Sequence, residues 1–172
     1  KQPQQQHQQR QQQQHHQQQQ QQQHPQPHQQ EEHYISQVKF DAHNNVIVQW
    51  VPRSQQQSIM LKCAITNGSC VDVHHHVSST GWDAGKGSLV THKDVVFVVE
   101  DDEERFAHVC MINTTTGHKS FVTSGKWHVV SLLQVYSDRL YFAHTQRGDG
   151  HRDVSSIAIA NALYTVARGK SD

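Results

Sequence analysis

Residues 95–112 read VVFVVEDDEERFAHVCMI, which is an apolar run, a polar turn and then a second strand-like run. The same order occurs once before this stretch and once after it. The three first runs start 49 and then 45 residues apart, at Val46–Trp50, Val95–Val99 and Leu140–His144. The three second runs lie 48 residues apart, at Ile59–Ala64, Ala107–Ile112 and Ser155–Ala160.

A repeat of this length predicts radially arranged sheets, because β-propeller blades recur every 40–50 residues or so. A blade holds four antiparallel strands, and the first repeat offers four strand-like runs, at His33–Phe40, Val46–Trp50, Ile59–Ala64 and Cys70–His75. No stretch has helical periodicity beyond a turn or two. We therefore expect an all-β fold of about three blades, at residues 33–79, 87–125 and 127–169, that form a partial propeller over 33–169. The last strands are expected at Val154–Ala160 and Leu163–Ala167, the latter only because the repeat requires one.

The residues before these repeats have a different composition. Twenty of the first thirty are Gln, and His and Pro interrupt them. Such a tract has little apolar surface to bury and cannot offset the entropy of ordering its backbone, about 1–2 kcal/mol per residue. Residues 1–32 are therefore expected to be a disordered polyglutamine-type segment. Its scattered His residues reflect composition rather than a metal site.

The overall charge argues against a nucleic-acid partner, because 15 Lys and Arg balance 15 Asp and Glu. No apolar run approaches the roughly 20 residues that cross a bilayer. The chain begins with Lys1 and shows no signal peptide. Since the true start of the protein can lie upstream, this tells little about targeting.

Three motifs suggest chemistry, and each has a simpler interpretation. The Gly-rich stretch 81–87 lacks the spacing and the Ser or Thr of a phosphate-binding loop. His74 and His76 share one face of a strand and could chelate a metal, but the sequence identifies no third ligand, so a solvated edge is expected. Glu100–Glu104 lacks the pattern of a calcium loop and is expected to be a solvated hairpin tip.

No nucleophile is marked by the local sequence. The chain has no G-x-S-x-G, the turn that presents a nucleophilic serine in α/β-hydrolases. We therefore predict no catalytic residue, no metal ligand and no cofactor, and no hydrolysis by this chain alone.

Two N-glycosylation sequons lie in predicted turns, at Asn67-Gly68-Ser69 and Asn113-Thr114-Thr115. Cys63 and Cys70 lie close to the first of them. Together the sequons and the close cysteine pair favour a secretory route, since disulfides persist in oxidising compartments.

Several motifs occur in a characteristic order. They are His33-Tyr34, VIVQWVPR at 46–53, Cys63, STGW at 79–82, RFAHVC at 105–110, FVTSGKWHVV at 121–130 and SDRLYF at 137–142. Over residues 33–160 the chain resembles the N-terminal propeller of the dipeptidyl peptidase IV family, within the prolyl oligopeptidase superfamily.

The resemblance implies a function for the whole protein. In this family an eight-bladed propeller caps an α/β-hydrolase domain, and the chamber between them admits peptides, from which dipeptides are released after a penultimate Pro or Ala. The proteins are usually dimers held at the cell surface by one N-terminal helix, as single-pass type II membrane proteins. This chain would then be a fragment of the chamber wall in a serine-type dipeptidyl peptidase. The alternative is a catalytically inactive member that serves as a membrane-protein partner.

The resemblance also assigns roles to individual residues. After T-G-W the peptidases often carry an Arg and a Phe that border the substrate pocket. Lys86 stands there instead, and it can keep a positive charge but cannot form a bidentate bond as Arg does.

The resemblance aligns Cys63 and Cys70 with a hairpin disulfide of the family. A two-residue turn at Asn67-Gly68 would leave these cysteines diagonal and too far apart. The disulfide requires either a turn shifted to Thr66-Asn67 or a wider four-residue loop. Cys110 is expected to be free and largely buried, because the strand at Lys119–Thr123 offers no partner.

Overall fold

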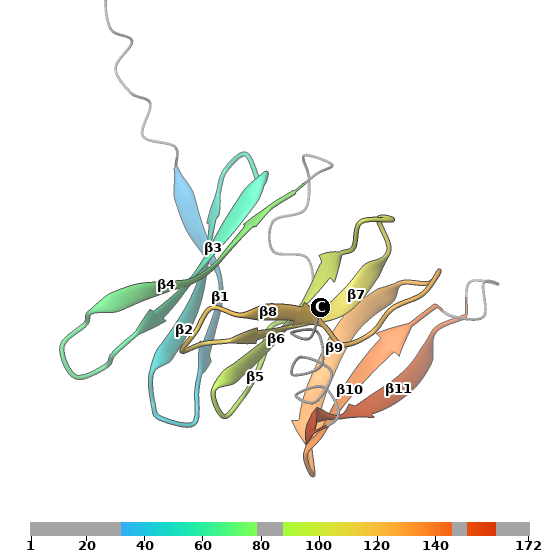
Figure 1. Ribbon diagram of the computed structural model, residues 1–172. Coiled ribbons are helices and arrows are strands. Elements are labelled where there is room, and N and C mark those ends of the chain that lie inside the picture. Colours follow the sequence, from blue (N-terminus) through green and yellow to red (C-terminus); the bar gives the residue numbers. More distant parts are fainter. Residues whose placement is uncertain (1–31, 79–87, 146–150, 161–172) are drawn as a thin grey trace, which may run out of the picture. The chain divides into compact units, whose positions relative to one another are not determined.

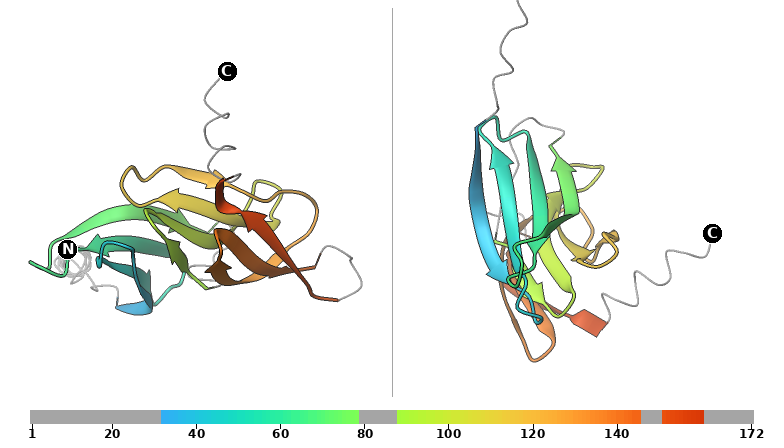
Figure 2. Two further views of the ribbon diagram at one scale, coloured as in Figure 1. Left: turned by 90° about the horizontal axis from the view of Figure 1, so that it is seen from below. Right: turned by 90° about the vertical axis from the view of Figure 1, so that its left-hand side faces the viewer.

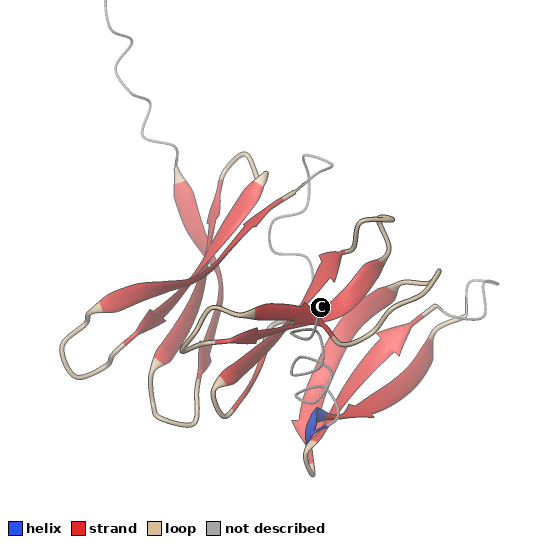
Figure 3. Ribbon diagram, in the orientation of Figure 1, coloured by secondary structure: helices blue, strands red, loops and turns tan. Residues whose placement is uncertain are grey.

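A computed structural model describes residues 32–78, 88–145 and 151–160, which form three antiparallel sheets (Figures 1 and 3). Blade 1 has the order β1-β2-β3-β4 and contains β1 (His33–Phe40), β2 (Val46–Pro52), β3 (Gln57–Cys63) and β4 (Cys70–Val77). Blade 2 has the order β5-β6-β7-β8 and contains β5 (Val90–His92), β6 (Val95–Asp101), β7 (Ala107–Asn113) and β8 (Lys119–Phe121). Blade 3 has the order β11-β10-β9 and contains β9 (Val129–Tyr136), β10 (Arg139–His144) and β11 (Asp153–Ala158).

The all-β prediction and the blade-like succession of sheets are confirmed, since every described sheet is an antiparallel meander. The strand expected at Val154–Ala160 was partly wrong, because β11 ends at Ala158 and the next two residues have helical backbone. Ile159 donates its amide to the carbonyl of Asp138 (3.0 Å) in the β9–β10 turn and buries its side chain. The predicted strand Leu163–Ala167 and the segment 1–31 lie outside the described residues. Within the ranges that are described, no helix is long and apolar enough to span a bilayer.

Blade 2 is buried on both faces, which explains why its sequence does not alternate between apolar and polar residues. One face of β6 and β7 packs against blade 3 and the other packs against blade 1, and Figures 1 and 2 show the three sheets side by side. The first core contains Val95, Phe97, Val109, Met111, Val129, Leu132, Leu140, Phe142 and Ile159. The second contains Ile47, Met60, Val73, Leu89, Val96, Val98, Cys110 and Ile112.

Blades 1 and 2 join their last two strands by the same kind of four-residue loop, at 65–68 and 114–117. In each, the fourth loop residue is a glycine with φ of +69°, at Gly68 and Gly117. Its amide donates to the carbonyl of the residue before the loop (2.9 Å in both cases), Ala64 or Asn113. The repeat seen in the sequence therefore extends to the geometry of its turns.

The β1–β2 turn is organised by the carboxylate of Asp41. Its Oδ1 accepts the backbone amides of His43 and Asn45, both at 2.8 Å. Its Oδ2 accepts the side-chain amide of Asn45 at 2.8 Å and lies 3.3 Å from Nζ of Lys62. Burial opposes ionisation of Asp41, but these hydrogen bonds outweigh it and lower the pKa of the carboxyl below 3.8.

We expect the substitution Asp41→Asn to lower the free energy of unfolding at neutral pH by about 1–3 kcal/mol, because an amide nitrogen would then face Lys62 and Asn45. A lowered pKa means that the stabilisation from Asp41 is complete above its unfolded value, near 3.8, and is lost as the pH falls below that value. Urea denaturation at pH 7 and pH 3 measures both effects. The difference between the wild-type and Asp41→Asn proteins should shrink at pH 3, and an unchanged difference would contradict the role of the charge.

Candidate functional site

A polar cluster lies at the seam between blade 1 and blade 2. We call His74, His76, Glu100 and Lys119 the seam cluster. Nε2 of His74 lies 2.7 Å from Oε1 of Glu100, and Nδ1 of His76 lies 3.5 Å from Oε2. The Lys119 ammonium lies 2.8 Å from the same Oε2. The Glu100 side chain is only 5% exposed, so this carboxylate is held almost entirely by protein groups.

A β-bulge sets which histidines face the seam. The register of β4 against β3 shifts between Met60 and Leu61, which pair with His74 and Asp72, so Val73 is an extra residue. Strict alternation from Cys70 would place His75 on the face toward blade 2. The extra residue reverses this and places His74 and His76 there, beside the core that contains Met60.

Glu100 reaches the same seam from β6. It follows Val96 and Val98 at alternate positions, and both pack in the core shared with blade 1. Lys119 begins β8 opposite Ile112, which belongs to the same core. The four side chains therefore come from one face of blade 1 and the facing side of blade 2.

Burial alone would hold Glu100 in its neutral form, yet the pKa of this carboxyl lies far below its usual range. Hydrogen bonds from His74, His76 and Lys119 outweigh the cost of burial and keep the carboxylate ionised. Burial likewise opposes the charge of Lys119, but its hydrogen bond and attraction to Glu100 raise the pKa of the ammonium. The seam cluster is thus a charged group in a shielded position.

A cavity of about 600 Å³ borders the cluster at His76 and Lys119. Asp101, Asp102 and Glu103 line it together with Arg105. The acidic residues after Glu100 therefore face a hollow beside the seam, which gives an ion or small molecule a route to the cluster.

Two expectations from the sequence were wrong here. His74 and His76 are not a solvated edge, because their side chains are only 12% and 16% exposed and lie against Glu100, and one nitrogen or oxygen atom from each of the three residues lies within 4.8 Å of the others. Glu100 is not part of a solvated hairpin tip but is buried at the seam. The sequence carried a partial signal, a His-x-His pair in a strand and an acid at the end of an apolar run, but nothing in it indicated the bulge.

The TSGKW motif at 123–127 has a structural role. The Gly125 carbonyl accepts a hydrogen bond from Nε2 of His108 at 2.9 Å, and the Thr123 hydroxyl accepts the Val109 amide at 2.9 Å. The Trp127 ring meets His108 edge-on at 5.0 Å and stacks on Phe142 at 6.3 Å. The motif thus joins the end of blade 2 to the core of blade 3.

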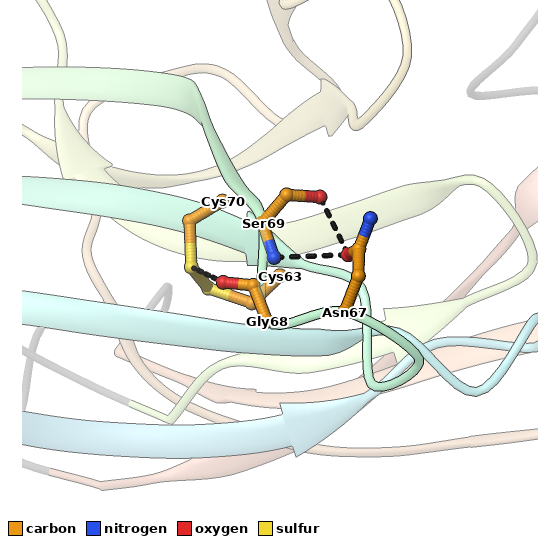
Figure 4. Close-up of a disulfide and its surroundings, with 5 residues drawn as sticks. All are labelled: Cys63, Asn67, Gly68, Ser69 and Cys70. Carbon is orange, nitrogen blue, oxygen red and sulfur yellow. Dashed lines mark hydrogen bonds between the residues drawn. A yellow bond between two sulfur atoms is a disulfide. The ribbon is translucent and has the colours of Figure 1, made fainter.

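The cysteines take the arrangement shown in Figure 4. Cys63 and Cys70 face each other in the β3–β4 register and form a disulfide, with the four-residue loop 65–68 between Ala64 and Ser69. Of the two turns that could permit the bond, the structure therefore has the wider one. Cys110 is a free, buried thiol, and burial raises its pKa well above the usual range.

The sequons lie at corresponding hairpins. Asn67 is exposed, and its Oδ1 accepts the amide and the hydroxyl of Ser69 at 3.0 and 2.8 Å (Figure 4). Oδ1 of Asn113 accepts the amides of Thr115 and Thr116, both at 2.9 Å. In each case the hydrogen bonds use the oxygen, and a glycan would be attached to the nitrogen. Lys86 lies outside the described residues.

We expect the double substitution Cys63→Ser and Cys70→Ser to lower the free energy of unfolding by about 2–3 kcal/mol, because a short covalent loop restricts the unfolded chain. Denaturation measures this loss. Mass spectrometry without reduction should find Cys63 joined to Cys70 and should find Cys110 modified only after unfolding. A Cys70–Cys110 link or three free thiols would contradict the pairing.

Three successive antiparallel blades, the middle one buried on both faces, define a β-propeller segment. The family model of the dipeptidyl peptidase IV N-terminal region matches residues 7–170. The chain therefore belongs to this family.

Three relatives share between 23% and 25% identity with the chain. Dipeptidyl peptidase 4 of Sus scrofa is 25% identical over 120 residues, which cover 64% of this chain and 16% of that protein. Prolyl endopeptidase FAP of Bos taurus is 23% identical over 141 residues, covering 75% and 19%. Inactive dipeptidyl peptidase 10 of Mus musculus is 24% identical over 143 residues, covering 76% and 18%. The chain thus spans less than a fifth of the length of each of these relatives.

A solved structure supports the fold. The crystal structure of Porphyromonas gingivalis dipeptidyl peptidase 4 superposes with a TM-score of 0.64 at 18% identity, covering 74% of this chain and 19% of that one. At this identity the similarity shows the propeller fold alone.

Proposed function

We propose that this chain is a wall segment of the peptide chamber in a dipeptidyl-peptidase-IV-like serine exopeptidase. The whole protein would release N-terminal dipeptides, and the propeller would limit which peptides reach the hydrolase domain. The observation that carries this proposal is the match of the family model to residues 7–170. In this proposal the described part of the chain serves as wall, with blade 2 packed between blade 1 and blade 3.

A second candidate is the propeller of an inactive family member that acts as a membrane-protein partner. The identity to inactive dipeptidyl peptidase 10 of Mus musculus, 24% over 143 residues, lies between the 23% to prolyl endopeptidase FAP of Bos taurus and the 25% to dipeptidyl peptidase 4 of Sus scrofa. Lys86 also replaces the Arg that the family's peptidases often carry. The identities do not separate the two candidates, so the replacement at Lys86 is the point that favours the inactive one.

The two candidates differ in one measurable activity. The full-length protein should cleave a Gly-Pro chromogenic substrate, and a serine-directed inhibitor should abolish the cleavage. A folded full-length protein without this activity would support the inactive partner instead. The isolated chain should have no activity in either case, and inhibitor-sensitive cleavage by it would contradict the assignment of the chemistry to another domain.

The family also suggests where the protein is found. We propose a cell-surface, single-pass type II membrane protein that is a homodimer at full length. We further propose glycans on Asn67 and Asn113, since both lie at hairpin ends with their side-chain nitrogens outside the hydrogen bonds described above. Treatment of the secreted or surface-expressed protein with an N-glycosidase should lower its mass, and Asn67→Gln and Asn113→Gln should each remove one glycan.

A further inference from the structure

We propose that His74, His76 and Glu100 bind a divalent transition-metal ion of the zinc class at the seam between blade 1 and blade 2. The two imidazoles come from β4 and the carboxylate comes from β6, so the ion would link two blades. This inference concerns the seam and is independent of any peptidase activity.

The donor set suits such an ion. Two imidazole nitrogens and one carboxylate oxygen make up one of the common three-residue zinc sets in proteins, with a fourth position for water. Tetrahedral bonds of about 2.0–2.1 Å place ligand atoms about 3.3 Å apart. Nε2 of His74 lies 2.7 Å from Oε1 of Glu100 and Nδ1 of His76 lies 3.5 Å from Oε2, so the two imidazoles lie beside different oxygens of the same carboxylate. All three ligand atoms lie within 4.8 Å of one another, so rotation of the side chains would bring them to a common centre.

The surroundings favour a specific site over a chance group. The side chains of His74, His76 and Glu100 are 12%, 16% and 5% exposed, so they are mostly buried but still accessible to solvent. The bulge at Val73 turns both histidines to the seam, where β6 supplies the carboxylate. The cavity at His76 provides an entry route and room for a water ligand. Its three acidic side chains, Asp101, Asp102 and Glu103, outnumber its two basic ones, Arg105 and Lys119, which favours cations.

Lys119 occupies the position of a competing cation. Its ammonium lies 2.8 Å from Oε2 of Glu100, and its side chain is 39% exposed and borders the cavity. A metal ion would therefore displace this ammonium toward the cavity. Removal of the lysine charge should consequently strengthen metal binding, whereas a purely structural ion pair gives no such effect.

The test measures Zn²⁺ affinity and stoichiometry by competition with a chromophoric chelator. It uses the full protein and the variants His74→Gln, His76→Gln, Glu100→Gln and Lys119→Met. The matched control is His75→Gln, because His75 lies between the two ligands in sequence and borders the same cavity, but pairs opposite Ile59 on the other face and is not one of the three clustered ligand residues. The histidines of the Gln-rich segment and any sites elsewhere remain the same in every variant, so differences between variants isolate the seam.

We expect each ligand variant to bind Zn²⁺ at this site about 100-fold more weakly or worse. This loss is larger than the one that follows when a residue that only hydrogen-bonds to a ligand is replaced. The His75→Gln protein should bind as the wild type does. The Lys119→Met protein should bind roughly tenfold more tightly, since a unit positive charge beside the site repels the ion. Co²⁺ should give visible absorption typical of low coordination in the wild-type and Lys119→Met proteins but not in the ligand variants.

Two results would overturn the proposal. One is equal affinity and stoichiometry in the wild-type, His75→Gln and ligand variants, which would assign all binding to other histidines. The other is unchanged Zn²⁺ affinity in Lys119→Met, which would leave the seam cluster as an ion pair only. The Lys119→Met measurement remains informative even where a ligand variant fails to fold. Its expected result is tighter binding, which a folding defect cannot produce.

Discussion

Replacement of Phe97 by Ala should lower the free energy of unfolding by about 3–5 kcal/mol, the usual loss for a large aromatic ring in a closed core. Phe97 is fully buried between blade 2 and blade 3, in the core that contains Val109, Leu132 and Phe142. Because blade 2 is covered on both sides, its strands have little freedom to collapse into the cavity. Urea denaturation followed by tryptophan fluorescence should show the change, since Trp127 packs against the same core.

Phe97→Leu is the matched control for this prediction. It keeps most of the apolar volume, so its cost should be about 1 kcal/mol, near the range of volume-conserving changes. Equal losses for the Leu and Ala variants would indicate that the shape of the ring, rather than the buried volume, determines the stability. A loss below 1 kcal/mol for Phe97→Ala would contradict the core between these blades.

Replacement of Gly125 by Ala should cost about 2–3 kcal/mol, for two reasons that act together. Gly125 has φ of +117°, where side chains other than hydrogen are strained. A Cβ at this position would also lie 2.8 Å from Nε1 of Trp127, so the indole would have to move. Movement of Trp127 would disturb its contacts with His108 and Phe142, and both the denaturation midpoint and the fluorescence maximum of the folded protein should change.

Gly68→Ala separates the two causes. Gly68 has φ of +69°, yet an added Cβ would meet nothing within 4 Å. Its substitution should therefore cost only the backbone strain, about 1 kcal/mol. Equal effects at Gly68 and Gly125 would show that the contact with Trp127 contributes nothing.

Much of the fold could be predicted because the strands of blade 2 are continuous apolar runs. Val95–Val99 is rich in β-branched residues, and such a run is typical of a strand that is buried on both faces. The 48-residue spacing then placed the neighbouring sheets. The period could not fix the strand ends, since these depend on contacts with other blades.

The end of β8 and the start of β9 illustrate this limit. A strand was predicted over Lys119–Thr123, but β8 ends at Phe121 because the Thr123 hydroxyl, rather than a backbone carbonyl, accepts the Val109 amide. The third blade was expected to begin at residue 127, but its first strand, β9, begins at Val129. The Trp127 amide bonds to the Gly125 carbonyl at 3.0 Å, so the chain turns there before the ladder begins.

The seam cluster could be predicted only in part. The sequence marks His74 and His76 as neighbours on one face of a strand, but their partner Glu100 lies 26 residues from His74 in another blade. Glu100 is followed by five charged residues, so it has the local pattern of a solvated turn. Glu100 is buried because blade 1 packs against β6, and the local sequence around Glu100 does not indicate this packing.

The extra residue at Val73 determines how β4 would respond to an in-frame deletion. Loss of a single codon from positions 71–73 would remove the bulge while His74 stayed opposite Met60 and His76 stayed opposite Ser58. Both of these histidines would still face blade 2, and His75 would still face away from it. A lineage could thus lose or gain the bulge through one in-frame deletion or insertion and keep the pair beside Glu100.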